Sequence, residues 1–122
     1  MIVTTLQEVT GYRVAKTLGL ARGNTIRARH VGRDFMAGLR GVVGGEITDY
    51  TKMLAEAREQ ALDRMVAEAA VLGANGVLGV RFATSYLMSS AAEILVYGTA
   101  VYLEPVDSAA VKDAAVSEGS TR

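Results

Sequence analysis

The first third of the chain alternates between apolar and polar positions in the manner of β-strands. Residues 2–5 read Ile-Val-Thr-Thr, and these β-branched side chains predict a short strand. In residues 12–20 the even positions are mostly apolar, and this period of two predicts a half-buried strand. Residues 22–24 have the composition of a turn, and residues 25–30 alternate again. We therefore expect a β-hairpin with its turn at residues 22–24.

A helical period dominates residues 49–72. Apolar side chains recur there every three to four positions, and charged side chains occupy the other faces. Thr48 or Asp49 can cap the first turn, and Gly73 suits the left-handed residue that ends a helix. The apolar stripe is rich in alanine, so we expect the surface that packs on it to come close. These residues predict one long amphipathic helix.

Two further strands are predicted after this helix. Residues 77–86 alternate, with Leu78, Val80 and Phe82 on one strongly apolar face. Residues 94–103, ILVYGTAVYL, are apolar on both faces, which requires a cover on both sides. In so small a protein we expect the second cover to be another subunit. Two further candidates for oligomer or packing contacts are Tyr97 and Tyr102.

Residues 33–45, RDFMAGLRGVVGG, combine glycines with apolar side chains. Interpreted as a short helix, the segment places Phe35 on its buried face. The smooth strip of that helix consists of Gly38, Gly41 and Gly45. An interior glycine costs about 1 kcal/mol of helix stability relative to alanine, so the strip favours a close packing or subunit contact. Anion binding at the paired glycines and a plain loop are the alternatives, whereas a phosphate loop needs a lysine where this chain has Glu46.

Together these elements predict an α+β fold, with an antiparallel sheet and one long and one short helix on one of its faces. We expect residues 1–104 to form this single domain. Residues 105–122 are rich in alanine, serine and charge without a lasting period, so we expect a flexible C-terminal tail there.

Composition narrows the functional classes. The chain of 122 residues has no cysteine, which leaves neither a disulfide nor a thiolate metal site. No charge-free stretch is long enough to cross a bilayer, and the N-terminus has no signal-peptide pattern. We therefore expect a cytoplasmic protein without a membrane contact.

The charges are distributed unevenly along the chain. Residues 1–45 carry seven basic and two acidic side chains, whereas residues 46–122 carry six basic and eleven acidic ones. Such a split is typical of complementary surfaces in an oligomer, or of plain solvated faces. We do not expect nucleic-acid binding, because the basic residues are not interleaved with aromatic ones.

No catalytic or cofactor site stands out in the sequence. The serines, scattered acids and single histidine form no nucleophile motif, so we expect no enzyme activity and no cofactor. Asp34 and Glu46 are interpreted as helix N-terminal acids, with an acid–base role as the lesser alternative. His30 shares its strand phase with apolar neighbours and is interpreted as a packed core or interface histidine. One histidine cannot hold a metal in a monomer, so His30 is only a weak metal candidate, in a cyclic oligomer that repeats it.

The order of these motifs resembles the YbjQ family of uncharacterised bacterial proteins. The similarity covers residues 1–103 and rests on MIVTT, GYRV, RDFMAGLRGVVGG, YTKMLAEAREQALDRMVAEAAVLGANGVLGVRF and YGTAV. The resemblance implies a compact α+β subunit that assembles into a homopentamer, and it brings a heavy-metal-binding label. It implies no catalytic residue.

These observations predict a protein whose main partner is itself. We expect a non-enzymatic, ring-like homo-oligomer, a pentamer by the resemblance, that acts as a scaffold or interaction module. The alternative is a module that binds a small ligand or a metal ion at its subunit interfaces.

Overall fold

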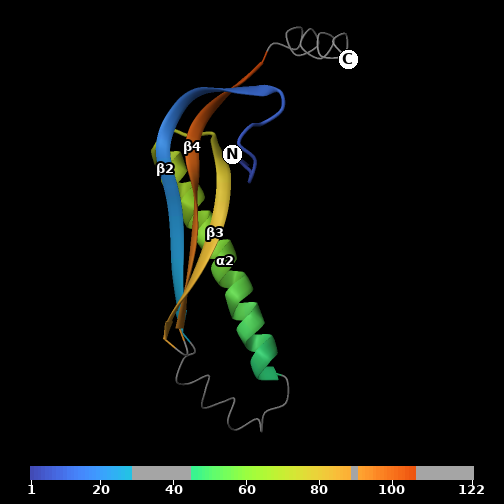
Figure 1. Cartoon of the computed structure of the whole chain (residues 1–122), viewed down its shortest axis with the longest axis vertical. Coiled ribbons are helices and arrows are strands. Elements are labelled where there is room, and N and C mark those ends of the chain that lie inside the picture. The colour runs from blue at the N-terminus through green and yellow to red at the C-terminus, as the bar shows by residue number, and fades with distance from the viewer. Residues whose placement is uncertain (29–44, 89–90, 107–122) are drawn as a thin grey trace.

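The computed structural model describes residues 1–28, 45–88 and 91–106. Their elements, in chain order, are β1 (Ile2–Val3), β2 (Tyr12–Ala28), α2 (Gly45–Val71), β3 (Gly76–Met88) and β4 (Ala91–Pro105). The strands form one sheet in the order β1-β3-β4-β2, and α2 runs obliquely across one face of it (Figure 1). This is the small α+β domain that the sequence predicts.

β4 is the central strand of the sheet. Both β2 and β3 pair with it in the antiparallel direction, whereas the two residues of β1 pair with β3 in the parallel direction. The sheet is therefore mixed, and the prediction of a purely antiparallel sheet is wrong at β1. The reason is the route of the chain: after β1 it crosses to the opposite edge, so no hairpin forces β1 and β3 to oppose each other.

The predicted hairpin turn at residues 22–24 is wrong, because β2 runs through these residues without a break. Gly23 serves a different purpose, which is to let the helix come close. A Cβ atom added to it would collide with the carbonyl oxygen of Ala61 and would lie 2.5 Å from the amide nitrogen of Met65. The main chain of α2 thus lies directly on β2, and only glycine leaves room for it.

The alternation predicted for residues 12–20 is also interrupted. The register of β2 against β4 shifts twice within this half of the strand. As a result Leu18 packs against the core beneath α2, whereas Leu20 lies on the other face of the sheet with 57% of its surface exposed. The even positions therefore do not share one face, because each bulge moves the following side chains out of phase.

The long helix is confirmed, although α2 begins at Gly45, ahead of the predicted residue 49. Its buried stripe repeats every four residues and consists of Met53, Ala57, Ala61, Met65 and Ala69. Gly73 has a φ of +85°, which is the left-handed conformation predicted for the residue that ends the helix.

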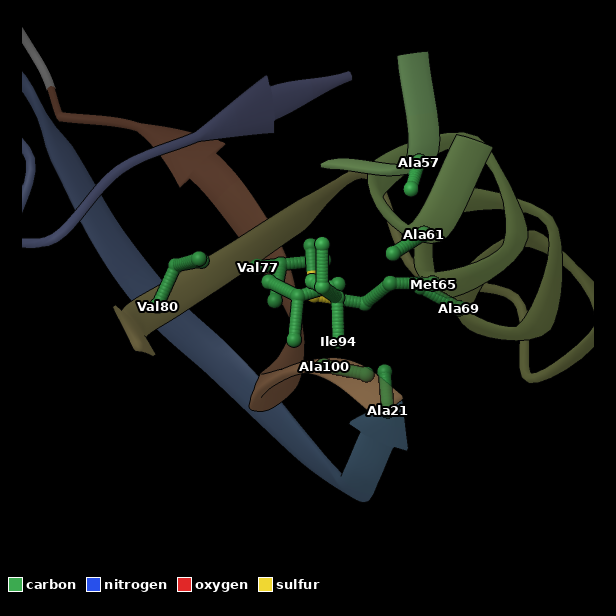
Figure 2. Packing of buried hydrophobic residues seen from close by; sticks show 10 residues of the cluster. Ala21, Ala57, Ala61, Met65, Ala69, Val77, Val80, Ile94 and Ala100 are labelled. Carbon is green, nitrogen blue, oxygen red and sulfur yellow. The ribbon is translucent and has the colours of Figure 1, made fainter. Parts of the chain in front are cut away.

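The main core lies between this stripe and the sheet (Figure 2). The strand residues of this core are Ala21, Val77, Val80, Ile94, Val96 and Ala100. The buried Thr25 hydroxyl donates a 3.1 Å hydrogen bond to the carbonyl of Ala57. A buried hydroxyl left without a partner costs about 1–3 kcal/mol, so this bond fixes where α2 sits along β2.

Two predicted segments lie outside the described residues. The short helix expected within residues 33–45 falls almost wholly in the range 29–44, and most of the expected tail falls in the range 107–122. Both stay predictions.

Replacement of Gly23 by alanine should lower the free energy of unfolding by about 1–3 kcal/mol, because the new methyl group overlaps the main chain of α2. Urea denaturation at one fixed chain concentration measures the change. Arg58→Ala, at an exposed position on α2, is the control and should stay within about 0.5 kcal/mol of wild type. Equal stabilities for the two variants would contradict the close seating of the helix.

Candidate functional site

The sheet face opposite α2, which we call the open face, is only partly covered. Directly opposed residues of antiparallel strands point to the same side, and the register therefore places Leu20, Ile26 and Tyr97 on this face. Their exposed fractions are 57%, 56% and 38%. Large apolar side chains gathered on an exposed face are typical of an interaction surface.

The N-terminal segment covers one end of the open face. The side chains that meet there form a second cluster of Ile2, Val9, Leu78, Val101 and Leu103. The amide of Gly79 donates to the carbonyl of Leu6, and the amide of Val80 donates to the carbonyl of Thr4. Gly79 adopts a φ of +63° at a bulge in β3, which turns its amide toward the segment. The N-terminal segment therefore covers the open face only as far as this bulge.

A row of three side chains crosses the middle of the open face, because Arg22 of β2 and Arg81 of β3 both oppose Tyr97 of β4. The Arg81 guanidinium donates to the carbonyl of Thr5 at 3.0 Å and to that of Val80 at 2.8 Å. Among the described residues Arg22 has no hydrogen-bond or ion-pair partner. Guanidinium groups beside a phenol ring suit a carboxylate or another small anion.

The other face of the sheet is also incompletely covered, since α2 packs mainly on β2 and β4 and scarcely touches β3. Phe82 opposes Val96, and Tyr86 opposes Ala92, so both aromatic side chains lie on the helix side of β3. Phe82 is 47% exposed and Tyr86 is 78% exposed. Exposed apolar side chains therefore lie on the helix side of the sheet at β3 as well as on the open face.

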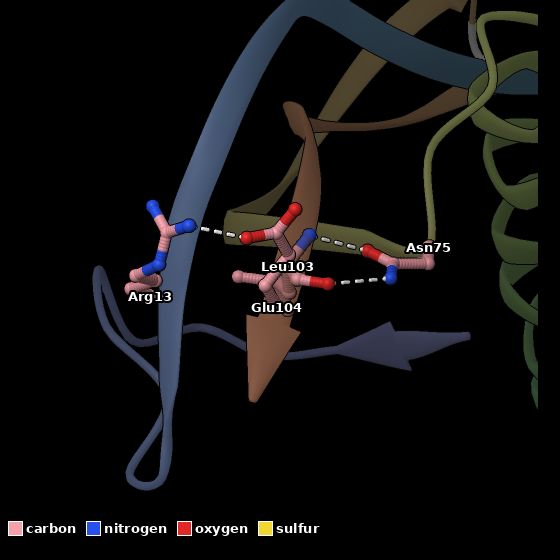
Figure 3. Close-up of polar contacts among 4 residues, drawn as sticks. All are labelled: Arg13, Asn75, Leu103 and Glu104. Carbon is pink, nitrogen blue, oxygen red and sulfur yellow. Dashed lines mark hydrogen bonds and ion pairs between the residues drawn. The ribbon is translucent and has the colours of Figure 1, made fainter. Parts of the chain in front are cut away.

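The polar groups near the C-terminal end of β4 are joined to one another (Figure 3). Arg13 and Glu104 form an ion pair between β2 and β4. The Asn75 side chain donates to the carbonyl of Leu103 at 2.8 Å and accepts from its amide at 2.6 Å. The Asn75 bonds tie the connection between α2 and β3 to the central strand, and the ion pair joins β2 to β4. We assign both to stability.

The residues predicted to make contacts fall into three groups: exposed strand residues, the first residue of α2, and residues outside the described ranges. Tyr97 is on the open face, and Tyr102 is 41% exposed on the helix side, where it opposes Lys16. Gly45 is the first residue of α2. The predicted positions outside the described residues are His30, Phe35, Gly38 and Gly41. Contact roles for all of them stay predictions.

Sequence reasoning missed several residues that form this surface. The sequence pattern indicates a turn at Arg22, places Phe82 on a strongly apolar strand face, and places Leu20 on the same face as Leu18. The available signal was the uncharged and partly aromatic stretch 82–88 in a strand, which is unusual for an edge.

The described ranges hold neither a cluster of metal ligands nor a helix that could cross a membrane. In residues 1–28, 45–88 and 91–106 no group of three or more His, Asp or Glu side chains is placed to hold a metal ion. None of the helical residues described makes a span that is long and apolar enough to cross a membrane.

Comparisons with known proteins place the chain in a family. The YbjQ family model, described as "Putative heavy-metal-binding", matches residues 1–104. A UPF0145 protein of Thermus thermophilus is 60% identical over 105 residues, which cover 86% of this chain and 92% of that protein. A UPF0145 protein of the archaeon Methanosarcina acetivorans is 58% identical over 101 residues, covering 83% of this chain and 95% of that protein.

A solved structure has a similar fold. It is a crystal structure of a protein of unknown function from the DUF74 family of Pediococcus pentosaceus, with a TM-score of 0.60 and 16% sequence identity. The match covers 85% of this chain and 98% of that chain. The relatives come from archaea as well as bacteria, so the range is wider than the bacterial one expected. The resemblance drawn from the motifs is confirmed: the chain belongs to the YbjQ family of uncharacterised proteins.

Proposed function

We propose that this chain is a self-assembling interaction module, a non-enzymatic subunit of a ring-like homo-oligomer. Five copies is the number that the family resemblance implies. Residues 1–104 would form the assembling unit, and residues 105–122 a tail outside it. The observation that carries the proposal is the open face, where large apolar side chains lie exposed beside the Arg22 guanidinium, which has no partner among the described residues.

The energetics of this face favour a protein partner. Full burial of a leucine or isoleucine side chain is worth about 1.5–3 kcal/mol, and Leu20 and Ile26 are each more than half exposed. Tyrosine and arginine are the residue types enriched at the centre of protein interfaces, and Tyr97 and Arg22 lie side by side here. A second copy of the chain would bury all four side chains.

Light scattering of the purified chain at micromolar concentration should give a mass several times the chain mass of 12.9 kDa. Leu20→Lys combined with Ile26→Lys should shift this mass toward the monomer, because two like charges would then face the buried interface. The dissociation constant should rise tenfold or more.

Val71→Lys is the matched control, since Val71 is 87% exposed at the end of α2, away from the open face. It should leave the mass unchanged. A wild-type chain that stays monomeric at these concentrations would refute the proposal.

A second candidate function is the binding of a small anion, and the row of Arg22, Tyr97 and Arg81 favours it. The planar guanidinium forms paired hydrogen bonds with phosphate or carboxylate oxygens, and the phenol can add a third. An oligomer would present one such row per subunit. The metal-binding form of this alternative rests on His30. Titration of the wild type and of His30→Ala with zinc, copper or nickel would test whether His30 binds a metal ion.

Calorimetric titration with inorganic phosphate and with pyrophosphate tests the anion site. Arg22→Gln should weaken binding tenfold or more, whereas Arg58→Gln, an exposed arginine on α2, should leave it unchanged. Absence of binding heat in the wild type, or equal affinity in both variants, would exclude the site.

A further inference from the structure

The outer side of β2 is a long free strand edge. β2 is the last strand of the sheet, and along its 17 residues no described main chain pairs with its outer side. From Leu20 to Ala28 its register against β4 is regular. Arg64 of α2 donates to the carbonyl of Asn24 at 2.6 Å, but this bond engages one carbonyl group only. A regular edge of this length is a template for another strand.

A second free edge lies at the other side of the same sheet. β1 pairs with β3 only at Gly76 and Val77, and the N-terminal main chain reaches as far as Val80. From residue 82 to residue 88 no described main chain covers the outer side of β3. This stretch, FATSYLM, contains neither charge nor proline, which are the devices that protect natural edges from pairing.

The charges of β2 and β3 determine which pairing of the two free edges is favourable. All four charged residues of β2 are basic, namely Arg13, Lys16, Arg22 and Arg27. Pairing of two β2 edges about a two-fold axis would therefore align cations from both chains, which is unfavourable. Pairing of two β3 edges would leave both β2 edges open. Only β2 against β3 satisfies both edges of every copy.

The direction of the strands permits this joint. β2 and β3 each run antiparallel to β4, so they run parallel to each other within the chain. A copy generated by rotation about a ring axis that runs along the strands keeps its strand direction. β2 of one copy then meets β3 of the next as a parallel pair, and such a head-to-tail contact closes into a ring when the rotation is right.

We propose that the subunits are joined edge to edge, with the outer side of β2 in one copy paired in parallel with residues 82–88 of β3 in the next. This joint rests on the self-assembly proposed above and specifies its partner surface. The sheet then continues from copy to copy, and the open faces of all copies lie on the same side of it. Closure of the ring with α2 on the outside turns these faces toward one another, which covers their apolar side chains.

The position of α2 explains the exposed aromatic side chains of β3. Three strands span about 14 Å, whereas one helix is only about 10 Å wide, so a single helix leaves one strand bare. α2 lies over the edge strand at Gly23, and therefore at the proposed joint. The next copy's β3 then has a helix on each side, and Phe82 and Tyr86 fill the space between the two helices.

Cysteine cross-linking tests the joint, because the chain has no cysteine of its own. The β2 positions are Arg22 and Ile26 and the β3 positions are Ala83 and Ser85, all exposed on the open face. Each of the four positions is first replaced by cysteine alone. The four combinations of one β2 and one β3 position are then made as double variants, and they sample four alternative registers of β2 against β3. A disulfide forms only where Cα atoms lie about 4.4–6.8 Å apart.

After mild oxidation, at least one double variant should give a non-reducing ladder that ends at the full ring, whereas every single variant should run as a monomer. Val71→Cys combined with Ser85→Cys is the control and should give no ladder. Dimers from a single variant would indicate a two-fold joint and overturn the proposal. So would four double variants that all fail to cross-link.

Light scattering of the same reduced variants separates the two proposals. A multimer without β2–β3 cross-links refutes the edge joint and leaves self-assembly in place. A monomer refutes both. Circular dichroism of each variant confirms that the exposed substitutions leave the fold intact.

Discussion

The contact of α2 with β2 determines the arrangement of the other elements. Gly23 brings the helix main chain onto the strand, the alanine stripe keeps it there, and the Thr25 hydroxyl fixes its position through the Ala57 carbonyl. Because the helix is held over an edge strand and not over the middle of the sheet, β4 is buried beneath it while β3 is not. The distribution of exposed apolar surface follows from this displacement of α2 toward the β2 edge of the sheet.

The displacement of α2 toward β2 also relates the candidate surfaces to one another. The open face, the bare aromatic side chains of β3 and the two free edges are each incomplete in the single chain. Continuation of the sheet into further copies would pair the two edges and cover the aromatic side chains of β3, since a neighbour's strand and helix arrive at the same boundary. Closure of the ring would then bring the open faces toward one another. A small-anion site at Arg22 and Arg81 is the alternative use of this row, because burial of Arg22 and Tyr97 against another copy would close it to an anion.

Periodicity predicted the helix, its terminating Gly73 and the two C-terminal strands, because each is set by local residue pattern. It failed at Gly23, where a glycine between polar residues has the composition of a turn. The reason for this glycine is the close approach of Ala61 and Met65 on α2, far along the chain. Tyr97 could be anticipated from a strand that is apolar on both faces. Leu20 and Phe82 could not, because their exposure depends on bulges and on where the helix lies.

The central strand is also the last strand of the described residues, and this has a consequence for synthesis on the ribosome. β2 and β3 do not pair with each other, and both depend on β4 for their hydrogen bonds. Until residues 91–105 have emerged, the nascent chain can form its helix but not its sheet. Folding must then bring together segments separated by most of the polypeptide, which is typical of slow, late collapse. Chaperone contact would be most useful in that interval.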